Sequence, residues 1–265
     1  MDRVRKVAIL VDGGFFLKRL KRWPKIDREN PQEVAKAIRG LCKRHVQKLI
    51  GEKASERDSR WLDHVYRLFY YDAEPFSGVP HHPFKNRQIN YGVTPEAQFR
   101  RNLFNEVRKL RKFALRLGSV KQDGYWSPYD HHMKGLLKIW SHREYLLSVL
   151  EDPSRHDSMR SEAAINALRV WGALSEDDLQ LPLRQKGVDM RIGLDIATMT
   201  LKRQVDTIIL VTGDSDFIPA AKLARREGVE FILDPLWQSV EDGLLEHVDG
   251  ITSGFLEPAM ADNRP

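Results

Sequence analysis

Apolar runs alternate with amphipathic stretches along most of the chain, and this alternation predicts a succession of strands and helices. Five runs rich in β-branched or aromatic residues predict strands, at 4–12, 65–71, 113–120, 207–213 and 229–233. Apolar residues recur at helical spacing in the intervening segments 15–22, 31–50, 98–112, 186–202 and 219–227, and a short helix is predicted near 244–248. Strands that alternate with helices indicate a doubly wound, mainly parallel sheet, so the predicted fold class is α/β.

Two stretches depart from this alternation. The segment from Pro75 to Pro95 holds four prolines and two glycines, which predicts an irregular excursion. Residues from about 122 to 182 are aromatic, contain histidines and show mostly helical patterns, with breaks near Pro128 and Pro153. We therefore expect a single domain over residues 1–265 with a largely helical insertion at about 122–182.

Acidic residues stand at the ends of two predicted strands. Asp12 ends the first strand, and Asp214 and Asp216 directly follow the strand 207–213. Ligands of open α/β sheets bind at the carboxyl ends of the strands, so these acids are expected to share one edge of the sheet. Carboxylates gathered with few basic partners are costly unless a divalent cation neutralises them.

The segment 186–202 adds Asp189 and Asp195 to the candidates. Six positions on a continuous helix rotate two side chains by about 120° and separate them by about 9 Å. The two side chains therefore do not simply point the same way, and one arrangement that brings both to the site places Asp189 before the first turn while Asp195 approaches from the helix.

Each acid also has a purely structural interpretation. Asp12 is suited to cap the helix that follows Gly13-Gly14, and Ser215 or Asp216 is suited to cap the helix through Pro219. Asp189 is equally suited to cap the helix 190–202, and Asp195 to lie on its exposed face. Capping does not require that two strands deliver aspartate to the same edge, which favours a shared site.

Charge is distributed unevenly around this acidic centre. Residues 1–53 contain 15 Lys or Arg against 6 Asp or Glu, whereas residues 186–265 contain 8 against 14. An acidic centre beside basic segments suits an enzyme that acts on a polyanion, although basic segments are often only solvated faces. The candidate contacts to a phosphate backbone are Lys18 and Arg19, in the first helix, and Arg100 and Arg101, in the helix 98–112.

Aromatic residues near the basic segments are candidates to stack on unpaired bases. They are Trp23, Tyr125, Trp126 and Tyr129, although side chains of this kind are more often part of a core.

The single cysteine, Cys42, excludes an intrachain disulfide and a Cys-rich zinc site. The first twenty residues contain only a short apolar run that continues into Asp12 and Lys18. This pattern predicts neither a signal peptide nor a membrane span, and a cytoplasmic location is expected.

Three motifs together resemble the NYN domain of the LabA-like (DUF88) proteins, which are relatives of the PIN nucleases. They are Val11-Asp12-Gly13-Gly14-Phe15-Phe16, Lys186-Gly187-Val188-Asp189 followed by Asp195, and Thr212-Gly213-Asp214-Ser215-Asp216-Phe217. A weaker similarity covers Tyr70–Pro75. Many relatives carry Asn shortly after the first Asp, where this chain has Gly14, Phe15 and Phe16.

The resemblance implies a ribonuclease-like site. Asp12, Asp189, Asp214 and Asp216 would bind Mg²⁺ or Mn²⁺, and Asp195 would be a fifth acid. Gly13, Gly14, Lys186 and Ser215 would lie against the substrate. Metal-assisted hydrolysis of a phosphodiester is the reaction that such a site serves best.

We therefore expect a metal-dependent endoribonuclease that acts on single-stranded RNA, with DNA as a second candidate substrate and self-association left open. Two alternatives remain: a non-catalytic RNA-binding or regulatory protein with the same fold, and a metal-dependent phosphatase acting on a small phosphate ester. A binder would be expected to have lost some of the acids, and a phosphatase would have a closed pocket instead of a basic groove.

Overall fold

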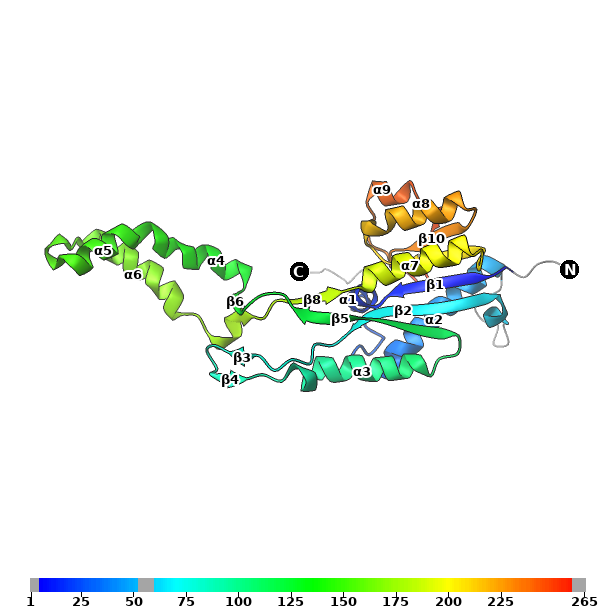
Figure 1. The fold of residues 1–265 in the computed structure, drawn as a ribbon, viewed down its shortest axis with the longest axis horizontal. Coiled ribbons are helices and arrows are strands. Elements are labelled where there is room, and N and C mark those ends of the chain that lie inside the picture. The colour runs from blue at the N-terminus through cyan, green and yellow to red at the C-terminus, as the bar shows by residue number, and fades with distance from the viewer. Residues whose placement is uncertain (1–4, 52–59, 259–265) are drawn as a thin grey trace. The chain divides into compact units, whose positions relative to one another are not determined.

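The computed structural model describes residues 5–51 and 60–258, and its contacts divide the chain into two compact units (Figure 1). The first unit comprises residues 1–77, 91–120 and 185–265. The second comprises residues 78–90 and 121–184, and therefore contains the segment predicted as an insertion. The organisation as one domain stays a prediction, and each unit is described by itself.

A seven-stranded sheet forms the centre of the first unit, in the order β11-β10-β9-β1-β2-β5-β8. All the pairings from β11 to β5 are parallel. The strands are β1 (Val7–Asp12), β2 (Val65–Glu74), β5 (Phe113–Gln122), β8 (Leu183–Lys186), β9 (Thr207–Val211), β10 (Glu230–Asp234) and β11 (Gly250–Ile251). The apolar side chains of β1 (residues 7–11) and all those of β9 are fully buried on both faces, as their continuous apolar runs predict, and the α/β fold class is confirmed.

Helices cover both faces of this sheet (Figure 1). One face packs against α1 (Gly13–Leu20), α2 (Pro31–Ile50) and α3 (Pro95–Arg108). The other packs against α7 (Val188–Leu201) and α8 (Ile218–Arg226). The short helix α9 (Asp242–Leu245) precedes β11.

The starts of α1 and α3 differ from the prediction because of their N-caps, and α3 also ends earlier than predicted. The side chain of Asp12 accepts a hydrogen bond from Phe15 N, so α1 begins at Gly13. The side chain of Thr94 caps α3, which begins at Pro95 and ends at Arg108 instead of residue 112. Lys112 has a left-handed φ of 67°, which a continuing helix does not allow.

The second unit is mostly helical. Its helices are α4 (Asp130–Leu136), α5 (Arg143–Glu151) and α6 (Ser158–Gly172), and 3₁₀ turns follow Leu136, Asp152 and Ser175. Two short antiparallel pairs complete it: β3 (His81–His82) with β4 (Arg87–Gln88), and β6 (Ser127–Pro128) with β7 (Leu179–Gln180). The excursion predicted between Pro75 and Pro95 thus contains a small hairpin.

Candidate functional site

Four adjacent strands deliver aspartates to one edge of the sheet. Asp12 ends β1 and lies opposite Tyr71 of β2, and Asp72 follows Tyr71. Asp234 ends β10 opposite Val211 of β9. Asp214 follows β9 by three residues, so the carboxyl ends of β2, β1, β9 and β10 each carry an acid.

Asp12 lies between the two neighbouring strands and is held on both sides. Its Oδ1 accepts a hydrogen bond from Phe15 N at 3.1 Å, which confirms that it caps α1. Its Oδ2 lies 3.4 Å from the hydroxyl of Thr212, at the end of β9. The cap therefore fixes the side chain while leaving Oδ2 with one long contact.

Asp214 is fixed in a similar way at the end of the neighbouring strand. Its Oδ1 accepts a hydrogen bond from Asp216 N at 2.9 Å, and its own N–H donates to Thr212 Oγ1 at 3.3 Å. Asp214 therefore caps the 3₁₀ turn Ser215–Phe217. The next helix, α8, has Phe217 as its N-cap and no side-chain cap hydrogen bond, so the interpretation that Ser215 or Asp216 caps the helix through Pro219 is wrong. The side chain of Asp216 is exposed.

Asp189 approaches these acids from α7. It occupies the first turn of that helix, which is capped by Gly187 with φ 80°, so the alternative that Asp189 is the N-cap is wrong. Asp214 and Asp216 are close enough to raise its pKa, after the larger contribution from burial. Asp189 therefore joins the group from a separate segment of the chain.

Repulsion between neighbouring carboxylates also affects the pKa of Asp12. Burial, followed by the charges of Asp189 and Asp72, raises the pKa of Asp12 to about 6, against an ordinary value of 3.8. Hydrogen bonds from Phe15 N and Gly14 N oppose this rise. Among residues 5–51 and 60–258, no Lys, Arg or His forms an ion pair with Asp12, Asp189, Asp214 or Asp216, and we call these four residues the acidic group.

The acidic group offers carboxylate oxygens, which are the ligands that Mg²⁺ and Mn²⁺ prefer. In the described part of the chain, no three His, Cys, Asp or Glu side chains lie close enough together to enclose one ion. Mg²⁺ usually keeps several water ligands and binds proteins through only one or two carboxylates. The donor types and the unneutralised charge therefore fit such an ion, although a complete all-protein cage is absent from the described residues.

Two residues predicted for the site form hydrogen bonds with residues outside the acidic group. Asp195 accepts hydrogen bonds from the hydroxyl of Tyr71 at 2.8 Å and from Arg116 Nε at 3.1 Å. Arg100 donates to both oxygens of Asp72, at 2.5 and 2.6 Å, and thereby neutralises a carboxylate that is 1% exposed. The packing of α3 and α7 against the sheet explains both pairings, which their sequence positions do not reveal.

The other predicted basic contacts are distributed over several elements. Arg19 donates to the carbonyl of Leu236, and Arg101 donates to the carbonyls of Ala97 and Gly92. Lys18 and Lys186 are exposed, and Ser215 is half-buried in the 3₁₀ turn. Lys186 and Ser215 lie within three residues of members of the acidic group, while Lys18 lies further along α1.

Gly13 and Gly14 begin α1 directly beside Asp12. A Cβ on Gly13 would lie 2.6 Å from the ring of Tyr70 and from the carbonyl of Tyr71, so close packing of α1 on β2 explains this glycine. Gly14 faces a more open region, where the nearest atoms to a Cβ would be Asp12 Oδ1 at 3.5 Å and Gln185 Oε1 at 3.9 Å. Gln185 in β8 is a polar neighbour of the site that the sequence did not single out, since β8 has no apolar run.

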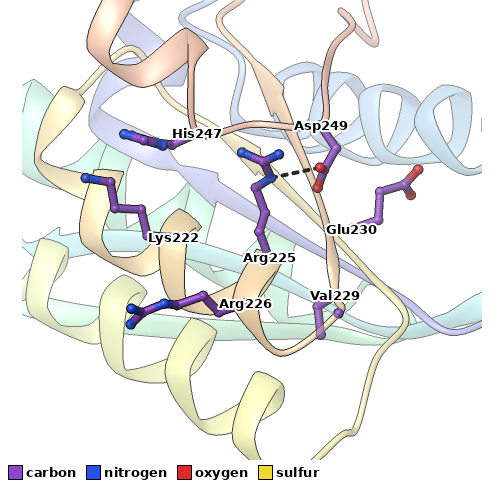
Figure 2. A pocket seen from close by; sticks show the side chains of 8 residues that line it. Lys222, Arg225, Arg226, Val229, Glu230, His247 and Asp249 are labelled. Atoms are coloured by element: carbon purple, nitrogen blue, oxygen red, sulfur yellow. Dashed lines mark hydrogen bonds and ion pairs between the residues drawn. The ribbon is translucent and has the colours of Figure 1, made fainter.

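A separate basic cavity of about 890 Å³ lies at the opposite edge of the sheet (Figure 2). Lys222, Arg225 and Arg226 line it from the last turns of α8, together with His247. Arg225 is paired with Asp249 at 2.8 Å, as the dashed line in Figure 2 shows. Because Glu230 begins β10 here, this cavity is at the amino ends of the strands and is separate from the acidic group.

A match to the NYN domain model covers residues 85–250, which is more than half of the chain. The chain therefore belongs to the NYN domain family, whose members are generally PIN-like nucleases acting on nucleic acid. The matched segment contains Asp189, Asp195, Asp214 and Asp216, whereas Asp12 precedes it and is connected to the site by the pairing of β1 with β9.

Other comparisons add little to the family assignment. No curated protein sequence matches the chain. A crystal structure of a protein of unknown function from Vibrio parahaemolyticus shares 14% identity, covers 95% of this chain and 93% of its own, and has a TM-score of 0.39. In the ranges 5–51 and 60–258, none of the helices combines the length and hydropathy of a membrane span.

Proposed function

We propose that this chain is a metal-dependent endoribonuclease of the LabA-like branch of the NYN family, with the acidic group as its active site. The observation that carries this proposal is the convergence of four carboxylates without a cationic partner in the described residues. Two of them, Asp12 and Asp189, have raised pKa values because of burial and of neighbouring carboxylates. A fold gains no stability from such an arrangement, which indicates that a bound cation completes it.

Two of the carboxylates that would bind the ion are held in position by hydrogen bonds to the backbone. In both Asp12 and Asp214 one oxygen is fixed by a backbone N–H, so the other oxygen is oriented before any ligand arrives. Asp189 and Asp216 would add negative charge from α7 and from the 3₁₀ turn. When bound, Mg²⁺ or Mn²⁺ would polarise the phosphate and favour formation of hydroxide for in-line hydrolysis.

Single-stranded RNA is the proposed substrate because the site is open. Asp189 and Asp216 are exposed, as are Lys186 and Lys18 on neighbouring elements. An exposed edge with flanking cations suits a polymer more than a small phosphate ester, which would be enclosed.

The test is cleavage of a labelled circular single-stranded RNA, because only an endonuclease can open a circle. We expect cleavage with Mg²⁺ or Mn²⁺, no cleavage in excess EDTA, and a loss of about 100-fold or more in rate for Asp214→Asn. The matched control is Asp63→Asn, an exposed acid that precedes β2 at the opposite edge of the sheet.

Each alternative has its own outcome in this assay. Equal cleavage by the wild type and Asp214→Asn, or cleavage that survives EDTA, would refute the proposed site. Binding of RNA without cleavage under any metal would indicate the regulatory protein. Hydrolysis of a small phosphate ester with an intact RNA circle would indicate the phosphatase, and a circular DNA tests the choice of sugar.

A further inference from the structure

The turn that follows β10 contains two adjacent residues in an unusual backbone conformation. Leu236 has φ 47° and Trp237 has φ 60°, in the left-handed region that bulky side chains rarely adopt. Such conformations are unfavourable for a bulky residue and persist only where the surrounding structure enforces them. Strained turns of this kind are concentrated at ligand sites, so the exposed side chains of this turn are candidates for contact with a ligand.

Several contacts hold the backbone of the turn. Leu236 N donates to Asp234 Oδ1 at 2.8 Å, and the Leu236 side chain is fully buried. Arg19 Nη2, in α1, donates to the carbonyl of Leu236 at 2.8 Å, and Arg22 Nη1, just after the end of α1, donates to that of Trp237 at 3.3 Å. The helix capped by Asp12 therefore also fixes this turn.

Trp237 is held by its edge while its ring remains accessible. The indole N–H donates to the carbonyl of Phe255 at 3.0 Å, which satisfies its only polar group. The residue is nevertheless 44% exposed, whereas the adjacent Leu236 is 0% exposed. Leu236 therefore anchors the turn in the core, whereas much of the Trp237 side chain is accessible to a ligand.

The exposed indole lines a cavity of about 450 Å³, a size typical of small-ligand pockets. Its lining combines apolar surface with a few polar side chains and includes Trp237, Gln238, Lys48, Ile251, Thr252 and Ser253. Lys48 Nζ donates to the carbonyl of Ser253 at 2.6 Å and lies 3.4 Å from Thr252 Oγ1, so within residues 5–51 and 60–258 one of its three protons remains for a ligand.

This cavity adjoins the acidic group. The side-chain nitrogen of Gln238 lies 2.9 Å from the position that a Cβ of Gly213 would occupy, and Gly213 directly precedes Asp214. Gly213 thus allows the Gln238 carboxamide to approach the chain one residue from the acid. Both the cavity and the acidic group lie at the carboxyl edge of the sheet.

We propose that this cavity is a nucleobase subsite for a single-stranded RNA substrate, with Trp237 stacking on the base. The Gln238 carboxamide, which can donate and accept, would bind the edge of the base, and the free proton of Lys48 would contact a neighbouring phosphate. Only an unpaired base can expose a face to the indole, so the subsite selects single strands over duplexes. This inference rests on the proposed function for the identity of the polymer.

The test compares Trp237→Leu with Trp237→Phe, in EDTA, by the Kd of a fluorescent single-stranded oligoribonucleotide. Both variants lose the hydrogen bond to Phe255, but only Leu loses the aromatic face. We expect binding about 5- to 100-fold weaker for Trp237→Leu and within about threefold of wild type for Trp237→Phe, since stacking on one base has this magnitude. Trp140→Leu is the matched control, because Trp140 is 66% exposed in the second unit.

A second variant, Gln238→Ala, leaves the strained positions intact and is expected to reduce the difference in Kd between oligonucleotides of different base composition. Equal Kd values for wild type and Trp237→Leu would overturn the subsite, as would equal losses in the Leu and Phe variants. Wild-type cleavage with unchanged Trp237→Leu binding would remove the subsite alone. Trp237-dependent binding without cleavage would remove the nuclease proposal alone.

Discussion

Four neighbouring strands, in the order β10-β9-β1-β2, carry an aspartate at the carboxyl edge of the sheet. The aspartates of the two outer strands of these four and those of the two inner strands have opposite environments. On the outer strands, Asp72 of β2 is paired with Arg100, and Asp234 of β10 lies 2.7 Å from His45 Nε2 with both side chains fully buried. On the inner strands, Asp12 and Asp214 have no cationic partner in the described part of the chain. The same residue type at equivalent strand ends therefore has a basic side chain as its partner in two cases and none among the described residues in the other two.

This difference separates acids that serve the fold from acids available to a ligand. A buried carboxylate with a partner of its own has its oxygens occupied by groups of the protein. Asp234, for example, also accepts hydrogen bonds from Leu236 N and Gly254 N. In Asp12 and Asp214, one oxygen accepts a hydrogen bond from a backbone N–H, and the other has no cationic partner among the residues that the structure describes. We infer that charge pairing, more than position along a strand, identifies the functional acids.

Removing the partner of an outer acid is expected to have the largest effect on stability. Arg100→Met leaves Asp72 buried and unpaired, which is expected to lower the free energy of unfolding by ~3–5 kcal/mol in urea titrations. Burial already raises the pKa of Asp72, so without Arg100 the acid can take up a proton more readily. The loss should therefore be smaller at pH 5 than at pH 8.

The double variant Asp72→Asn/Arg100→Met provides the control for this prediction, because it removes both charges. It should recover much of the lost stability. An equal loss in the single and double variants would show that Arg100 acts through packing, and the comparison between outer and inner acids would lose half of its basis.

Neutralising an inner acid is expected to raise the free energy of unfolding, instead of lowering it. The pKa of Asp12 is about 6 in the folded chain, so folding favours its protonated form, and the ionised form costs stability at higher pH. Asp12→Asn keeps a good helix cap and removes the charge, so in EDTA it should stabilise the protein by ~1–3 kcal/mol at pH 8. This gain should disappear as the pH falls from about 6 to below about 4, where wild-type Asp12 is protonated in both states.

Urea unfolding of Asp12→Asn and wild type across this pH range measures the effect. A loss of stability at pH 8 would mean that Asp12 is mainly a structural cap. The gain should also reverse when Mg²⁺ is added, since an ion that binds the wild-type acidic group stabilises only the native state.

Strands in which nearly every side chain is buried could be predicted from the sequence. The runs 7–11 and 207–211 form β1 and β9 because every side chain in them is buried, and Asp12 and Asp214 could be placed from the ends of these strands. Strand β8 was missed because all four of its residues are exposed, and β11 because it contains only two residues.

The pairing of acids was not predictable from sequence spacing. Asp72 lies 28 positions from Arg100, and Asp234 lies 189 positions from His45, so both partners depend on how α3 and α2 pack on the sheet. The strained turn at Leu236 and Trp237 was also missed, since neither residue type favours a positive φ. Local patterns identify the buried strands and the cap at Asp12, whereas the pairing of charges is a property of the assembled tertiary structure.

The smallest expected effect concerns Asp195, which the family resemblance places among the catalytic acids. Its carboxylate is engaged by Tyr71 and by Arg116, so by the pairing criterion it belongs with the structural acids. Asp195→Asn should therefore change the rate of RNA cleavage by less than about threefold and lower stability by ~1 kcal/mol or less, because the Arg116 pair is partly exposed. Cleavage and urea unfolding would be measured beside Asp214→Asn. A loss of rate comparable to that of Asp214→Asn would return Asp195 to the active site and would show that an acid paired in the free protein can change partners when RNA and metal bind.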